Sequence, residues 1–175
     1  MFDVRIETDL LIAFLDLSRF AEQSQSTPDR ELALGMNAFY ELVTLHIERA
    51  GGHVVKFIGD AALVVFDSAD VDRGVGALLE LPRAVEQLMQ ARGWTCRLRV
   101  KVHYGSAVVG PFGAAGHERL DVLGKAVNLA ARLPAHGFTL SVPAFRKLGP
   151  AARKRFKKHT PQVTYLRVED RHPST

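Results

Sequence analysis

The chain has 175 residues, of which 47% are apolar and 24% are charged, and its formal net charge is +4 at pH 7. A length and composition of this kind fit one globular domain and exclude disordered, collagen-like and fibrous chains. The single cysteine, Cys96, excludes an intrachain disulfide and a cysteine-based zinc cage. Because no signal peptide follows Met1 and no apolar run reaches transmembrane length, we expect a cytoplasmic domain with no membrane segment.

Apolar periodicity places the secondary-structure elements. In chain order it predicts a strand at 10–17, a helix at 28–50, strands at 53–58 and 61–66, a helix at 71–92, strands at 95–104 and 105–110, a helix at 124–136, a strand at 138–142, a partly helical stretch at 143–158 and a strand at 163–168. Thr27 is the expected N-cap of the first helix, and Pro82 is expected to interrupt the second. This order predicts an α+β protein with a ferredoxin-like α/β sandwich, in which helices pack on one face of a mainly antiparallel sheet.

Two aspartates stand at the ends of apolar runs. Asp16 closes the first predicted strand, and Asp60 lies in the Gly59-Asp60 turn between the second and third. Turn chemistry explains Asp60 by itself but explains Asp16 poorly. If the strands are neighbours, the two carboxylates converge, and carboxylate pairs without histidine or cysteine suit magnesium or manganese.

The last third of the chain is basic. Seven Lys and Arg residues crowd positions 146–158. We interpret them as a solvated surface, with a nucleotide phosphate or a nucleic acid as the more specific alternatives. A nucleic-acid-binding module of this fold would need exposed aromatic residues on its strands, and the predicted strands offer few, so we expect no nucleic-acid partner.

Four segments resemble the class III adenylate/guanylate cyclase family, in its order and at its spacing. They are residues 14–20 (FLDLSRF), 56–66 (KFIGDAALVVF), 102–110 (VHYGSAVVG) and 120–133 (LDVLGKAVNLAARL). The resemblance implies the class III cyclase fold for a single domain over 1–175, with a core at about residues 8–168. It also implies a homodimer with two equivalent sites at its interface.

The resemblance implies a role for six side chains, divided between two protomers. One protomer would supply the metal ligands Asp16 and Asp60, and its partner would supply Lys56 and Asp121 to read the base, Asn128 to orient the ribose and triphosphate, and Arg132 to hold phosphate charge in the transition state. Two divalent cations, magnesium or manganese, would serve each site. His103 matches a family position in the sheet, and we interpret it as structural.

The base-reading pair decides the expected substrate. Lys56 would donate to adenine N1 and Asp121 would accept from the adenine amino group, which offers guanine a poor match. The sequence therefore predicts an adenylate cyclase that converts ATP to 3′,5′-cyclic AMP and pyrophosphate. A guanylate or pyrimidine nucleotide cyclase, and a degenerate cyclase-like dimer that binds nucleotide without turnover, are the alternatives.

The chain departs from the family pattern at the first turn. The family usually has Gly-Phe-Thr where this chain has Arg19-Phe20-Ala21, a turn whose amides would wrap the triphosphate. Arg19 would either crowd the phosphates or supply a cation to them, and Phe20 is a candidate substrate-binding residue. The family's triphosphate lysine corresponds to Lys157 or Lys158, and the sequence does not choose between them.

Overall fold

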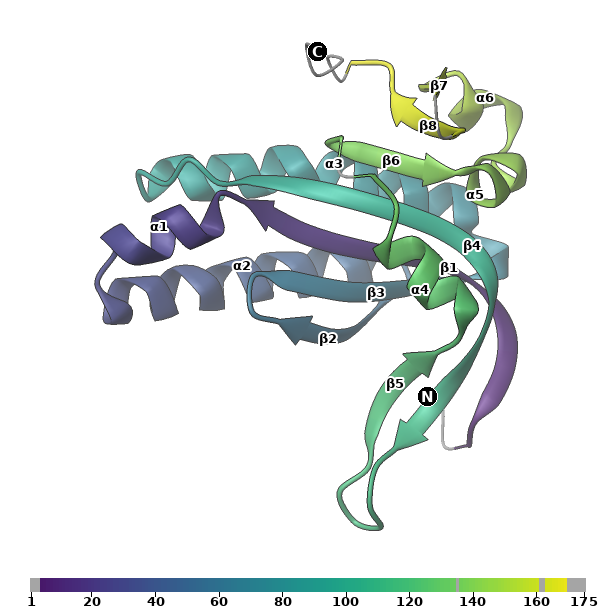
Figure 1. Cartoon of the computed structure of the whole chain (residues 1–175), viewed down its shortest axis with the longest axis horizontal. Coiled ribbons are helices and arrows are strands. Elements are labelled where there is room, and N and C mark those ends of the chain that lie inside the picture. Colours follow the sequence, from purple (N-terminus) through teal and green to yellow (C-terminus); the bar gives the residue numbers. More distant parts are fainter. Residues whose placement is uncertain (1–3, 135, 161–162, 170–175) are drawn as a thin grey trace.

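The protein is described by a computed structural model, which covers residues 4–134, 136–160 and 163–169 (Figure 1). Its strands are β1 (Ile6–Ser18), β2 (His53–Ile58), β3 (Ala61–Asp67), β4 (Arg97–Phe112), β5 (Arg119–Leu123), β6 (Phe138–Ser141), β7 (Phe156–His159) and β8 (Thr164–Arg167). Its helices are α1 (Phe20–Ser26), α2 (Asp29–Arg49), the 3₁₀ helix η1 (Ser68–Asp70), α3 (Val71–Ala91), α4 (Lys125–Ala131), α5 (Val142–Lys147) and α6 (Pro150–Arg153).

The strands form one sheet in the order β2-β3-β1-β4-β6-β8-β7, and β5 pairs with the far end of β4. All pairs are antiparallel except the pair of β4 with β6. The long helices α2 and α3 lie along one face, while the short α4 lies on the other (Figure 1). The predicted α+β sandwich with a mainly antiparallel sheet is thus confirmed, with α4 added on the face that was expected to be open.

The middle of the central strand β1, residues 10–15, is apolar at every position. Leu11, Ala13 and Leu15 join the core beneath α2 and α3, whereas Leu10 and Ile12 pack under α4 on the opposite face. Successive side chains of a strand point to opposite faces, so a strand covered on both sides needs an unbroken apolar run. β1 therefore carries its final residues, Asp16 among them, on a segment that is packed on both faces of the sheet.

Two helix predictions were wrong in detail. Thr27 does not cap α2; its hydroxyl donates to the Gln23 carbonyl at 2.8 Å and so closes α1, a helix that the sequence did not predict. Pro82 does not interrupt α3, which is helical on both sides of it. Residues on both sides of Pro82, such as Leu78 and Val85, are fully buried against the sheet, and this packing offsets the lost backbone hydrogen bond.

The second half of the chain differs more from the prediction. The strands expected at 95–104 and 105–110 are one strand, β4, and the helix expected at 124–136 ends at Ala131, before Pro134. The stretch at 143–158 is helical only in α5 and α6, and Lys157 and Lys158 lie in strand β7 instead. β5 was not predicted. In the part of the chain that the structure describes, no helix is long and apolar enough to cross a membrane.

Candidate active site

The two aspartates are brought together by the pairing of β1 with β3. Asp16 lies opposite Ala61, the residue that follows Asp60, and the Leu17 amide donates to the Asp60 carbonyl at 3.3 Å. The turn between β2 and β3 is made possible by Gly59, whose φ of 59° favours glycine. The convergence expected from the sequence is therefore confirmed as an arrangement of the backbone.

The electrostatics of the pair favour a bound cation. Burial raises the pKa of the Asp60 carboxyl, and the charge of Asp16 raises it further, while the residue's own backbone hydrogen bond and Arg99 act in the opposite direction. A positive charge near the Asp60 carboxylate would offset both its burial and the repulsion from Asp16. Oxygen ligands of this kind suit magnesium and manganese, so the residues present fit the expected cations.

Arg99 is a site residue that sequence reasoning missed. It projects from β4, directly opposite Asp16, and its guanidinium donates to the Asp16 carboxylate. Its Nε is buried and has no hydrogen-bond partner within the described chain. The alternation of basic and apolar residues in β4 was interpreted as a half-exposed strand; it also indicates that a row of cations faces the side of the sheet on which Asp16 lies.

Lys56 and Asp121 form the second part of the site. Lys56 lies in β2 and Asp121 in β5, and the Lys56 Nζ donates to the Asp121 Oδ2 at 2.7 Å. The other carboxylate oxygen, Oδ1, accepts the Val122 amide at 2.8 Å, which fixes the orientation of the Asp121 side chain. The exposed fractions of the Lys56 and Asp121 side chains are 41% and 24%, so the pair is open to a ligand.

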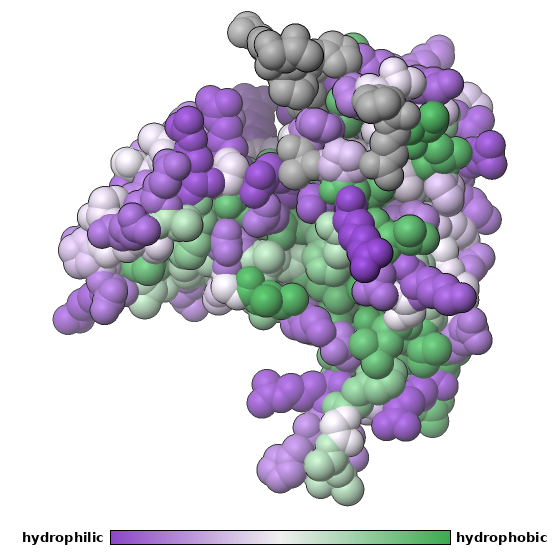
Figure 2. All heavy atoms as spheres, viewed as in Figure 1, coloured by the Kyte–Doolittle hydropathy of each residue, from purple (hydrophilic) through white to green (hydrophobic). Residues whose placement is uncertain are grey.

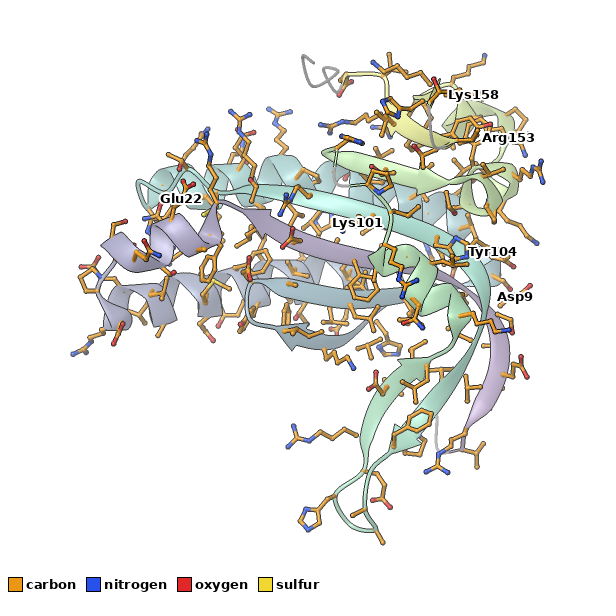
Figure 3. All side chains as sticks on the ribbon, viewed as in Figure 1. Asp9, Glu22, Lys101, Tyr104, Arg153 and Lys158 are labelled. Carbon is orange, nitrogen blue, oxygen red and sulfur yellow. The ribbon has the colours of Figure 1, made fainter. Side chains whose placement is uncertain are left out.

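Helix α4 presents the third part. Asn128 and Arg132 are exposed and lie four residues apart, on the same side of the helix. The Lys101 ammonium, from β4, donates to the Ala131 carbonyl at 3.1 Å and so attaches the end of the helix that carries Arg132 to the sheet (Figure 3). A cation at this end also complements the helix dipole.

Tyr40 supports the aspartate turn from α2. Its hydroxyl donates to the Gly59 carbonyl at 2.7 Å, and its ring stacks on Phe57 with centroids 4.1 Å apart. Burial raises the pKa of the Tyr40 hydroxyl, and the negative charge of Asp60 raises it further. The helical spacing of Tyr40 suggested only a core residue, because a hydrogen bond to a turn 19 positions away has no local signal.

The remaining predicted residues lie outside the three groups described above. Arg19 precedes α1 with φ 62° and ψ 16°, a left-handed conformation that its sequence neighbours do not predict, and Phe20 packs against the core under α2 and α3. Lys157 is half-buried and its ammonium donates to the Val168 carbonyl at 3.4 Å, whereas Lys158 is exposed. Both lysines lie in β7, at the opposite edge of the sheet from β2.

Within the described part of one chain, the two aspartates that would bind cations are therefore not linked to the residues that would bind the nucleotide. Across the described residues, no hydrogen bond or ion pair links Asp16 or Asp60 to any of Lys56, Asp121, Asn128 and Arg132. The buried His103 bonds to the Ser141 hydroxyl at 2.9 Å, and burial lowers the pKa of its imidazole. This arrangement agrees with the structural role expected for His103.

Comparison with known proteins gives a consistent result. The model of the family described as "Adenylate and Guanylate cyclase catalytic domain" matches residues 5–147. An adenylate cyclase of Anabaena cylindrica is 28% identical over 132 residues, which are 71% of this chain and 26% of that protein. The chain thus spans about a quarter of the length of the curated relatives it matches.

Solved structures share the fold. The adenylyl cyclase CyaB of P. aeruginosa is superimposed with a TM-score of 0.82 at 22% identity, over 96% of this chain and 97% of that one. The guanylyl cyclase Cya2 gives a TM-score of 0.78 at 21% identity, over 94% of this chain and 92% of that one. Both substrate types thus occur among proteins with this architecture.

Proposed function

Since the chain belongs to the adenylate and guanylate cyclase catalytic domain family, we propose that it is an adenylate cyclase that converts ATP to 3′,5′-cyclic AMP and pyrophosphate. We further propose that it acts as a homodimer with two divalent cations at each shared site. Lyase chemistry on a nucleoside triphosphate follows from the family, whereas the base, the cations and the dimer are inferred from the residues described above.

The contact between Lys56 and Asp121 is the observation that carries the choice of ATP. A donor and an acceptor 2.7 Å apart, on strands that are otherwise distant in sequence, match the N1 acceptor and the amino donor on the edge of adenine. An exposed ion pair contributes about 0–1 kcal/mol, so a base can replace it at low cost. Guanine presents a donor at N1 and an acceptor at its carbonyl, and would place like groups against each other.

The other residues would orient and stabilise the reacting groups. Asn128 would hold the ribose and triphosphate, while Arg132 would carry the charge that gathers on the α-phosphate. The Arg99 side chain is 36% exposed beside Asp16, and its accessible guanidinium atoms would donate to a phosphate oxygen. When bound by Asp16 and Asp60, the cations would lower the pKa of the ribose 3′-hydroxyl and neutralise charge on the triphosphate.

Bond changes in the proposed reaction are confined to the substrate. The ribose 3′-hydroxyl gives its proton to a substrate phosphate oxygen or to solvent, and its oxygen forms a bond to the α-phosphorus. The bond from that phosphorus to the bridging oxygen breaks, and pyrophosphate leaves. The chain supplies position and charge, since the single described histidine on this face of the central strands, His103, is buried and hydrogen-bonded to Ser141.

Two features support a shared site. The groups that hold cations and the groups that hold the nucleotide are unconnected within one chain, as described above. Large apolar side chains are also exposed beside the nucleotide groups: Ile58 in β2, Leu123 at the end of β5, and Leu129 in α4. Figure 2 shows apolar residues gathered over α4 and the β4–β5 arm. A second copy covering this face would bury them and complete the site.

The proposal is tested by product analysis. The purified chain is incubated separately with ATP, GTP, CTP and UTP, with manganese or magnesium, and products are identified by mass. We expect cyclic AMP from ATP, loss of product in Asp16→Ala, and retention in Asp67→Ala, a control carboxylate that is exposed at the far end of β3 from Asp60. A different cyclic nucleotide would overturn the assignment of the base, and no product at high protein concentration would favour a nucleotide-binding dimer without turnover.

A further inference from the structure

Charge is unevenly divided along the chain. Residues 122–168 contain ten Lys and Arg residues and no Asp or Glu, whereas the rest of the chain has a net charge of −6. The net charge of +4 is therefore the sum of a strongly basic quarter of the chain and an acidic remainder. When the basic residues also cluster in space, an imbalance of this size gives that side of the molecule a positive electrostatic potential.

Most of this charge is concentrated on one surface, which we call the basic end. Its members are exposed cations on α5, on α6 and on the chain from α6 into β7: Arg146, Lys147, Arg153, Lys154, Arg155 and Lys158. None of them forms an ion pair with any residue that the structure describes. Figure 3 shows Arg153 and Lys158 at the same end of the molecule, and their charges are unneutralised.

Apart from Lys158, a candidate triphosphate residue, no member of the basic end belongs to the proposed active site. Lys56 lies on β2 and Asp60 follows it, at one edge of the sheet, while β7 forms the opposite edge. α5 and α6 lie with β7 and β8 at that far edge (Figure 1). Their cations are therefore separated from Lys56 and Asp60 by the width of the sheet, whereas Asp16, in β1, and Asp121, in β5 beside β4, lie between the two edges.

The aromatic residues at the basic end argue against a nucleic acid. The Phe145 ring is stacked on Tyr165 with centroids 3.6 Å apart, and the Arg153 guanidinium lies 5.7 Å from the centroid of Phe145. Phe156 is buried. Single-stranded nucleic acids are bound through exposed aromatic rings on which bases stack, and these rings already have protein partners.

We propose that the basic end docks on the surface of an anionic lipid bilayer. Clusters of four to eight Lys and Arg residues bind acidic headgroups without a shaped pocket, because the attraction is to a diffuse negative surface. An apolar side chain lies beside the cations: the Val168 amide bonds to the Arg155 carbonyl at 3.0 Å, and Val168 is 51% exposed. Attraction of several cations together with one apolar contact suits a lipid interface.

The test measures co-sedimentation of the purified chain with vesicles of phosphatidylglycerol and phosphatidylcholine, compared with vesicles of phosphatidylcholine alone. We expect binding only to the acidic vesicles, decreasing as salt is added. Each basic residue near an anionic surface is worth about fivefold in binding. The triple variant Arg146→Glu, Lys154→Glu, Arg155→Glu should therefore bind about 100-fold more weakly or worse.

A matched triple variant separates local from general charge effects. Arg30, Arg49 and Arg92 are exposed on α2 and at the end of α3, and changing all three to Glu alters the net charge equally. We expect this control to keep at least one tenth of the wild-type vesicle affinity. Equal losses in the two triple variants, or no binding of the wild type to acidic vesicles, would overturn the proposal. Tighter binding to single-stranded RNA than to acidic vesicles, lost in the first variant, would overturn it in favour of a nucleic acid.

Discussion

The left-handed backbone conformation of Arg19 predicts a change in stability on substitution. The effect of backbone strain on this stability can be separated from the effect of the arginine charge. A non-glycine residue in this conformation costs about 1–2 kcal/mol, and glycine avoids that cost but loses about 0.4–1 kcal/mol through the freedom of the unfolded chain. Arg19→Gly should therefore stabilise the protein by about 0.5–1 kcal/mol. For a domain of this size, that gain raises Tm by about 1–4 °C. Because Arg19 makes no side-chain cap or ion pair among the described residues, its removal should cost little.

Three substitutions at position 19 test this reasoning. Arg19→Ala removes the charge but keeps the strained conformation, so its Tm should stay near that of the wild type. Arg19→Asn should fall between alanine and glycine, since asparagine tolerates positive φ better than other residues. The measurement is thermal and urea unfolding of the metal-free chain at neutral pH. Equal gains in the alanine and glycine variants would refute the backbone explanation and assign the effect to the arginine side chain.

Three further predictions concern the site itself. Lys56→Met should lower kcat/KM for ATP by about 10- to 100-fold, measured by steady-state kinetics, because it removes a charged hydrogen bond to the base and the cation that pairs with Asp121. Tyr40→Phe should destabilise the chain by about 1 kcal/mol in urea unfolding, since it loses the bond to the Gly59 carbonyl but keeps its ring. Asp60→Asn should raise the Tm of the metal-free chain at neutral pH, because the raised pKa makes the ionised Asp60 less favourable in the folded state. That gain should shrink as the pH falls and the native Asp60 becomes protonated; a gain independent of pH would contradict the assignment.

Much of the fold could be predicted because burial on two faces leaves a simple signal. The apolar run at 10–17 located the central strand β1, the Gly59-Asp60 turn located the β2–β3 hairpin, and the spacing of apolar residues located α2 and α3. Elements whose residues are mostly exposed gave weaker signals. β5 has one buried residue, Val122, and α1 has none, so neither shows an apolar period.

The candidate site residues could be predicted where they lie in segments that resemble the cyclase family. Contacts between residues that are distant in the sequence were harder to predict. Asp16 and Asp60 could be expected to meet because each ends an apolar strand. The approach of Lys56 to Asp121 was expected only from the resemblance, since 65 residues separate them. The pairing of Arg99 with Asp16 depends on the register of β1 against β4, which alternation along a single strand does not determine.

The shared active site is tested most directly by mixing two inactive variants. Asp16→Ala lacks a cation-binding carboxylate, and Arg132→Ala lacks the proposed transition-state cation, so each homodimer should form little or no cyclic AMP. In a mixture, one of the two sites of each mixed dimer would carry both substitutions and the other would carry neither. The account predicts recovery of cyclic AMP formation to at most half of the wild-type rate. No recovery, with mixed dimers demonstrated in the same sample, would contradict a site assembled from two copies of the chain.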